Sequence, residues 1–394
     1  MSRIDRTDTD IAPPDRERYT LDGDAAVEAR IAHDQSLIAE AVTELVSPPV
    51  FRGVVLMGGY GRGEGGYILR EGRPEPYNDY DYFVVVRRLD RAGRKALALA
   101  LADRAKTLEQ AVGVEVDFAL LRDERLPKAE FSLMNAEMIW GHRVVAGDPA
   151  VLDAMPPMPF RGLALGEFTR LMLNRGALLL MNRQRLAGGA TLDAAAREVF
   201  FKYLFKAMLA CGDARLAGAR RYHPSYVTKL ERLREGDWPG QAPFMALYTQ
   251  AWENKFHPSY VRYAAENTEA WQARVVAIWL ETLDWLEGIR VGRAIGDWTA
   301  YASHAIPKGQ DQASWGALRH LAITARDFGL AELLREPGWS RRYPRERLIS
   351  ALPLLLTHPD GPAPPVLARA LALPPRASFE EATATFLRLW RRYA

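Results

Sequence analysis

Apolar runs of strand length are concentrated in the first 150 residues of this 394-residue chain, which restricts where a β-sheet can form. "GVVLM" predicts a short buried strand at 53–57, "YDYFVVV" a second at 80–86 and "VEVDFALL" a third at 114–121. Helical spacing of apolar residues predicts helices at 24–46 and 91–112. Because helices and strands alternate, we expect this part to be an α/β unit.

From about residue 163 onward the apolar spacing is helical almost throughout. We predict helices at 163–186, 191–219, 224–235, 241–256, 267–292, 311–326 and 378–393. The last begins with "SFEE", a capping box. The fold class expected for the whole chain is therefore α+β.

The predicted domain boundaries follow from composition. A polar, proline-bearing stretch at 1–22 predicts a disordered leader, and the mixed domain then covers 23–157, where clustered prolines end the pattern. A helical domain follows at 158–294. Residues 295–394 form either an extension of that domain or a third small helical one.

Bulk properties exclude several classes of protein. The formal net charge is only +3 and basic residues form no runs, so nucleic acid is not an expected partner. Cys211 is the one cysteine, which rules out an internal disulfide and fits a reducing compartment. No stretch reaches 18 apolar residues, so we expect no membrane partner and a cytoplasmic location.

Six glycines lie between residues 58 and 66, directly after the first predicted strand. Gly61, Gly63 and Gly66 match the spacing G-x-G-x-x-G of dinucleotide-binding folds. That motif requires a helix next, but 67–78 contains two prolines and a glycine. A phosphate-binding P-loop requires Gly-Lys-Ser/Thr, and no lysine precedes residue 95. Both interpretations are therefore rejected.

Three carboxylates on the predicted strands suggest a metal site. Residues i and i+2 of a strand share a face, so Asp79 and Asp81 project side by side. Asp117 interrupts the third strand, where a carboxylate is costly to bury without a partner or a metal. Oxygen ligands of this kind suit Mg²⁺ together with substrate phosphates. The set fits a two-ion site for in-line displacement at phosphorus.

This order of strand, glycine turn, Asp-x-Asp strand and acidic strand resembles the active site of the DNA polymerase β-like nucleotidyltransferase superfamily. The loop "GGYGRGE" is similar to the N-terminal domain of uridylyltransferases that modify PII signalling proteins. The resemblance implies a nucleotidyltransferase α/β core with a small mixed sheet. It also implies that Gly58 and Gly59 hold the nucleotide's phosphates, and that Asp79 and Asp81 bind two Mg²⁺ ions, with Mn²⁺ as an alternative. Asp117 would bind the catalytic ion and help deprotonate the acceptor.

The resemblance covers about residues 34–155, and this chain departs from the family in two ways. Nineteen residues separate Gly59 from Asp79, which predicts an inserted β-hairpin or flap at about 66–77. None of the phosphohydrolase or ligand-sensing domains of the PII-modifying enzymes follows. The expected acceptor is therefore not a PII protein.

Two cations are candidates for binding the nucleotide. Arg62 lies within the glycine loop and would reach a phosphate oxygen, unless it makes an ordinary surface ion pair. Lys206 shares one face of an apolar helix with Lys202, and we expect it to reach the triphosphate. An internal echo, "YHPSYV" at 222–227 and "FHPSYV" at 256–261, predicts two helix starts.

These features predict an enzyme that moves a nucleoside monophosphate from an NTP to a hydroxyl or phosphate of an acceptor. A small molecule is the first choice of acceptor, a protein side chain the second and RNA the third. The alternative is a non-catalytic nucleotide-binding or scaffold protein that keeps the same fold.

Overall fold

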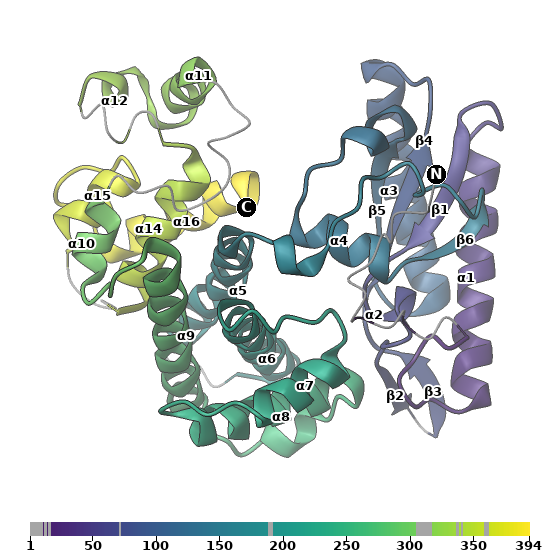
Figure 1. Ribbon diagram of the computed structural model, residues 1–394, viewed down its shortest axis with the longest axis horizontal. Coiled ribbons are helices and arrows are strands. Elements are labelled where there is room, and N and C mark those ends of the chain that lie inside the picture. The colour runs from purple at the N-terminus through teal and green to yellow at the C-terminus, as the bar shows by residue number, and fades with distance from the viewer. Residues whose placement is uncertain are drawn as a thin grey trace. The chain divides into compact units, whose positions relative to one another are not determined.

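The computed structural model describes residues 11, 14, 17–70, 72–187, 192–304, 317–335, 339, 342–357 and 362–394 (Figure 1). The chain divides into two compact units. Unit 1 comprises 1–163, 223–230 and 252–259, and unit 2 comprises 164–222, 231–251 and 260–394. Unit 1 is mixed and unit 2 is helical, so the predicted α+β class is confirmed.

Unit 1 is built on a mixed sheet with the strand order β5-β4-β1-β6. Its strands are β1 (Phe51–Leu56), β4 (Tyr80–Val86), β5 (Val116–Arg122) and β6 (Arg143–Gly147). β4 and β5 are parallel, while β1 is antiparallel to both β4 and β6. The three predicted strands are confirmed. β6 was not predicted, because its five residues lie just before a proline-rich stretch that obscures the strand pattern.

Helices α1 (Ala25–Leu45) and α3 (Arg91–Val112) pack on one face of this sheet and on each other (Figure 1). Their buried apolar residues, such as Ile31 and Leu101, form one core with Tyr80, Tyr82 and Val84 of β4. Asp24 and Asp90 accept hydrogen bonds from first-turn amides and so fix where the two helices begin. The second face of the sheet is thus the one on which the odd-numbered residues of β4 project.

A separate two-stranded antiparallel hairpin follows the glycine loop, formed by β2 (Tyr67–Arg70) and β3 (Arg73–Pro76). It replaces the helix that a dinucleotide-binding fold would have here. The predicted inserted hairpin is therefore confirmed. Its register pairs Tyr67 with Pro76, and β3 contacts α1.

The predicted leader, 1–22, ends in an ordered segment. Thr20 is fully buried and forms a β-bridge with Gly65. The amides of Tyr19 and Thr20 donate to the carboxylate of Glu28, and the guanidinium of Arg143 lies 4.0 Å from the Tyr19 ring centroid. Residues 1–10 of the leader lie outside the described residues.

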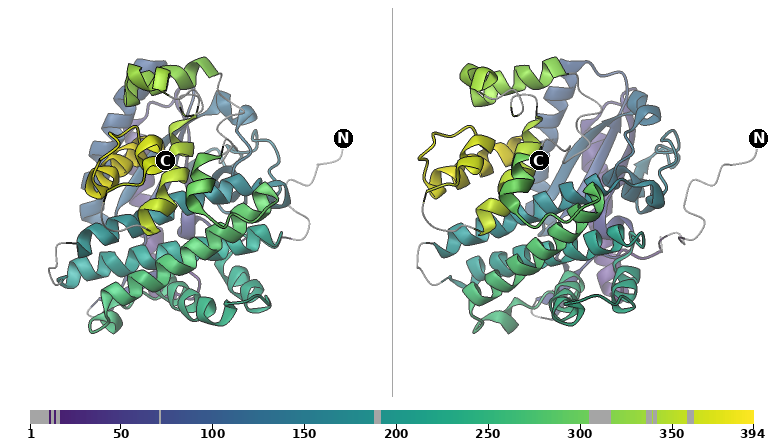
Figure 2. Two further views of the ribbon diagram at one scale, coloured as in Figure 1. Left: turned by 90° about the vertical axis from the view of Figure 1, so that its left-hand side faces the viewer. Right: turned by 60° about the vertical axis from the view of Figure 1, so that its left-hand side comes forward.

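Shorter elements complete unit 1, and helices make up unit 2 (Figure 2). In unit 1 these are α2 (Gly58–Gly61), η1 (Asp123–Lys128), α4 (Leu133–Trp140) and η2 (Phe160–Gly162). Unit 2 contains α5 (Leu165–Leu186), α6 (Ala194–Gly218), η3 (Tyr260–Tyr263), α9 (Thr268–Val291), α10 (Trp298–Ser303), α11 (Ala317–Phe328), α12 (Leu330–Arg335), α14 (Pro344–Thr357), α15 (Pro365–Ala370) and α16 (Phe379–Tyr393). Two helices, α7 (Tyr226–Arg234) and α8 (Gln241–Phe256), have residues in both units.

The seven predicted helices correspond to α5, α6, α7, α8, α9, α11 and α16. The first six residues of the predicted helix 311–326 lie outside the described residues. The predicted capping box of α16 is confirmed, since Ser378 and Glu381 exchange side chain-to-backbone hydrogen bonds. α10, α12 and α15 were not predicted because each has only six residues, and α14 because Pro353 lies inside it. Within the described part of the chain, no helix has the length and apolarity needed to span a bilayer.

Candidate active site on the sheet of unit 1

Two carboxylates lie on adjacent strands of the sheet, and a third directly precedes one of those strands. Asp79 immediately precedes β4, and Asp81 is its second residue. Asp81 pairs with Asp117 across the parallel β4–β5 ladder. Neighbouring strands lie about 4.8 Å apart and two residues span about 6.6 Å along a strand, so the three backbones form a compact triangle. Asp81 and Asp117 are exposed and Asp79 is half-buried.

The intervening tyrosines of β4 anchor the strand to α1 on the opposite face. The hydroxyl of Tyr80 donates to Asp34 Oδ2 at 3.0 Å, and that of Tyr82 donates to Gln35 Oε1 at 2.5 Å. Both tyrosines are buried. Because side chains alternate along a strand, these contacts fix the face on which Asp81 projects.

The glycine turn lies directly against Asp81. The amide of Met57 donates to the carbonyl of Asp81 at 2.8 Å. Gly58 has a φ of +67°, and a Cβ on it would lie 3.3 Å from Asp81 Oδ2. A Cβ on Gly59 would lie 2.9 Å from the carbonyl oxygen of Glu64. The close approach of backbone and carboxylate therefore requires glycine here.

Tyr60 holds the loop, the hairpin and the start of β4 together. Its hydroxyl donates to the carbonyl of Gly66 at 2.6 Å and accepts from the amides of Tyr77 and Asn78, at 3.0 and 3.1 Å. Its ring packs on Tyr80 with the centroids 4.9 Å apart. Since Asn78 directly precedes the first acid, Tyr60 sets the path of the backbone into the acidic cluster.

Arg62 is buried within unit 1, with only 8% of its surface exposed. Its Nε lies 3.3 Å from Glu64 Oε2, and its Nη1 lies 3.9 Å from Glu137 Oε2. Glu64 also accepts hydrogen bonds from the Ser225 hydroxyl and the Tyr226 amide. The glycine loop is thereby tied to a segment 160 residues further along the chain.

Sequence reasoning missed two lysines that this segment and its echo bring to the loop. Lys229 is fully buried, with its Nζ 4.0 Å from Glu137 Oε1 and 4.1 Å from the Tyr226 ring centroid. Lys255 Nζ lies 4.7 Å from the same ring, and Arg62 lies 5.4 Å from it. We call Arg62, Lys229 and Lys255 the cation cluster. The repeated "HPSYV" is the sequence feature that could have identified both lysines, because each lies within two residues of one copy.

The two lysines selected from the sequence belong to the other unit. Lys202 and Lys206 lie half-buried on α6 in unit 2. Gly58, Gly59, Arg62, Asp79, Asp81 and Asp117 all belong to unit 1.

The acids repel one another. Burial, followed by the negative charges of Asp79 and Glu109, raises the pKa of Asp117 above its ordinary value. A cation placed among the acids would relieve this repulsion. In the described ranges, no three acidic, histidine or cysteine side chains form a ready-made metal cage. Mg²⁺ commonly uses one or two carboxylates plus substrate phosphates, and the donors present fit that mode.

Comparison with known proteins gives no match: no family model, no curated protein and no solved structure matches this chain.

Proposed function

We propose that unit 1 is the catalytic unit of a Mg²⁺-dependent nucleotidyltransferase. It would move a nucleoside monophosphate from an NTP to a hydroxyl or phosphate of a small-molecule or protein acceptor and release pyrophosphate. The observation that carries the proposal is the parallel pairing of Asp81 with Asp117, with Asp81 Oδ2 against the glycine turn. This arrangement puts metal-binding oxygens beside a backbone that phosphate can approach closely.

In the proposed reaction, Asp79 and Asp81 would hold the metal. Mg²⁺, when bound, would neutralise the triphosphate and stabilise the departing pyrophosphate. Gly58 and Gly59 carry no side chain, so a phosphate oxygen would be able to approach their backbone closely. Asp117 would bind the catalytic ion and help deprotonate the acceptor hydroxyl.

The cation cluster is the proposed partner of the triphosphate within unit 1. Arg62, Lys229 and Lys255 carry three positive charges around one tyrosine ring, against the two carboxylates Glu64 and Glu137. Cations gathered in this way would attract the phosphates of a nucleotide, and their burial strengthens that attraction. Lys229 is therefore a second candidate for binding the triphosphate, beside Lys206, which was selected from the sequence.

Calorimetric titration of each NTP, with and without Mg²⁺, tests the proposal. We expect metal-dependent binding of one NTP that is lost in Asp81→Asn. The matched control is Asp103→Asn on α3, where the carboxylate is exposed and paired with Lys106. Metal-independent binding, or equal loss in both variants, would refute the site.

The alternative is a non-catalytic protein that only binds nucleotide. Water serves as a slow acceptor for many transferases, so an enzyme should convert the bound NTP to NMP and pyrophosphate on long incubation. Wild type should show this conversion and Asp117→Asn should not. Tight NTP binding without any NMP formation would favour the binding protein.

A further inference from the structure

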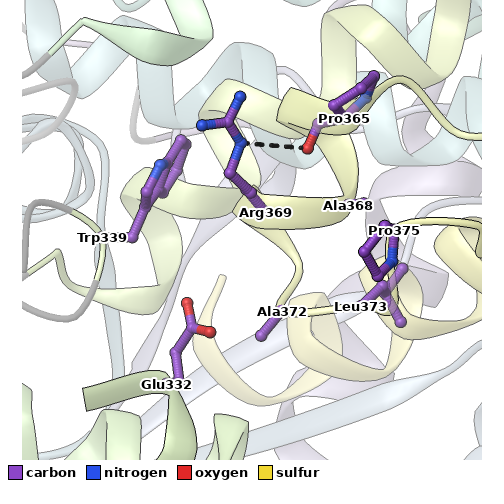
Figure 3. Close-up of a pocket in the computed structure, with 8 residues that line it drawn as sticks. All are labelled: Glu332, Trp339, Pro365, Ala368, Arg369, Ala372, Leu373 and Pro375. Atoms are coloured by element: carbon purple, nitrogen blue, oxygen red, sulfur yellow. Dashed lines mark hydrogen bonds between the residues drawn. The ribbon is translucent and has the colours of Figure 1, made fainter. Parts of the chain in front are cut away.

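Unit 2 contains a pocket of about 240 Å³ that plays no part in the proposed reaction. It lies between α12, Trp339, α15 and the turn that follows α15 (Figure 3). Its lining residues are Glu332, Trp339, Pro365, Ala368, Arg369, Ala372, Leu373 and Pro375. A 150 Å³ apolar cavity accommodates benzene, so this volume suits a ligand of about ten to twelve non-hydrogen atoms.

One end of the pocket carries a buried hydrogen-bond acceptor. Glu332 is only 6% exposed, and its Oε1 accepts from Arg347 Nη2 at 3.1 Å. Its Oε2 accepts no hydrogen bond from any residue that the structure describes. Figure 3 shows this carboxylate directed into the space beside Trp339 and Ala372. An acceptor oxygen directed into the pocket in this way favours a ligand that carries an O–H or N–H donor.

The charges around the pocket favour an anion at its other end. Arg369 lines the pocket, with its guanidinium at the far end of the view from Glu332 (Figure 3). Arg342 lies 4.0 Å from the Trp339 ring centroid, and Arg347 is fully buried behind Glu332. Among the described residues, Arg369 and Glu332 are the charged groups that line the pocket, and Arg347 already pairs with Glu332, so an anionic group of a ligand fits best beside Arg369. A guanidinium pairs most strongly with a carboxylate or phosphate.

The wall between these polar ends is apolar, and one of its residues has an unusual backbone conformation. Trp339, Leu373 and Pro365 supply the apolar surface. Ala372 has a φ of +55°, in the left-handed region normally taken by glycine after a helix. Strained positions of this kind persist only where the surrounding structure holds them in place. Here the strained residue supplies a methyl group to the pocket wall.

We propose that this pocket binds a small, elongated carboxylate with an aromatic body and a hydrogen-bond donor at its far end. The donor would bind Glu332 Oε2, the ring would lie against Trp339 and Leu373, and the carboxylate would pair with Arg369. A hydroxyaryl carboxylate has all three features in the required order.

Calorimetry or ligand-observed NMR on the full chain tests the proposal with three probes of one shape. 3-(4-Hydroxyphenyl)propanoate should bind with a dissociation constant below about 1 mM. 3-Phenylpropanoate, which lacks the donor, and 4-ethylphenol, which lacks the carboxylate, should each bind about tenfold more weakly. Absence of binding by the first probe, or equal affinity for all three, would overturn the assignment.

Substitutions of arginines outside the hydrophobic core test where the probe binds in the pocket. Arg369→Gln should weaken 3-(4-hydroxyphenyl)propanoate about tenfold and leave 4-ethylphenol unchanged. Arg376→Gln, an exposed arginine outside the pocket, is the matched control and should change neither. Equal effects of the two arginine variants would refute the carboxylate contact.

Two further variants test the wall of the pocket. Leu373→Trp should fill the pocket and abolish binding of every probe. Ala372→Gly relieves the left-handed backbone, so the variant should fold at least as stably while binding the probe two- to threefold more weakly. Unchanged affinity in both variants would show that the probe binds elsewhere.

Discussion

At the scale of single residues, Gly58 has two separate reasons to be glycine. Its φ of +67° and the 3.3 Å space beside Asp81 Oδ2 both exclude a Cβ without strain. We predict that Gly58→Ala destabilises the protein by about 1–2 kcal/mol and also abolishes NTP binding. Gly113→Ala is the control, because Gly113 has a φ of +84° with nothing within 4 Å. It should lose similar stability in urea denaturation but bind NTP normally. NTP binding by the Gly58 variant would contradict the assignment.

Asp117 illustrates a conflict between stability and activity. Its pKa is raised in the folded protein, so the folded state holds this proton more tightly than the unfolded state. Below the ordinary Asp pKa the carboxyl is protonated in both states and costs nothing. As the pH rises through and above that range, the ionised group destabilises the fold.

Asp117→Asn should therefore be more stable than wild type at pH 7, with no such gain near pH 3. We expect a gain below about 1 kcal/mol, because the side chain is exposed and water screens the repulsion. Urea denaturation at both pH values measures it. A variant that is less stable than wild type at pH 7 would show that neither burial nor the neighbouring carboxylates disfavour the ionised form of Asp117.

At the scale of elements, the Tyr60 hydroxyl joins the two ends of the β2–β3 hairpin, together with the bonds that Gly66 makes to the Tyr77 amide and the Asn78 side chain. Tyr60→Phe would leave the Asn78 amide without this acceptor, whereas the Tyr77 amide and the Gly66 carbonyl would still bond to each other, and we predict a loss of about 1–2 kcal/mol. Hydrogen exchange should accelerate at the Tyr77 and Asn78 amides. Tyr82→Phe removes one hydrogen bond, to Gln35, and should leave those two amides protected. Equal protection in both variants would mean that the hairpin is held by other contacts.

The lysines of the two units give a direct comparison. Lys229→Met removes the positive charge but keeps an unbranched side chain of similar length. Lys206→Met makes the same change on α6. If the cation cluster binds triphosphate, the first variant should weaken NTP binding at least tenfold and reduce its salt dependence. Unfolding of both variants is followed by circular dichroism. Loss of NTP binding in Lys206→Met alone would favour the lysine selected from the sequence.

At the scale of the whole molecule, unit 1 is not a continuous stretch of chain. Residues 223–230 and 252–259 belong to it. Glu64 receives hydrogen bonds from Ser225 and Tyr226 there, and Trp140 packs against His223. We predict that a fragment of residues 17–163 is markedly less stable than unit 1 in the full chain. Proteolysis and urea denaturation would test this, and a fragment of equal stability would contradict it.

Much of the fold was predictable because its signals are local. Strand β4 and helix α3 have the residue ranges predicted from side-chain periodicity, and the long spacing before Asp79 predicted the hairpin. β6 and the six-residue helices α10, α12 and α15 were missed, since so few residues show no clear period. The ordered segment around Thr20 was also missed, because its order comes from a β-bridge to Gly65, far away in the chain.

The sequence alone determined which residues could form the acidic face. Alternation along a strand is a property of the backbone, so Asp81 had to lie on the face opposite Tyr80 and Tyr82 once β4 formed, with Asp79 at the start of that strand. Tertiary structure decided the rest. It paired Asp81 with Asp117, brought the "HPSYV" segments to the glycine loop, and buried Lys229 beside Glu137. Such contacts join residues as far as 161 positions apart, and their free energy depends on packing and burial that no local pattern encodes.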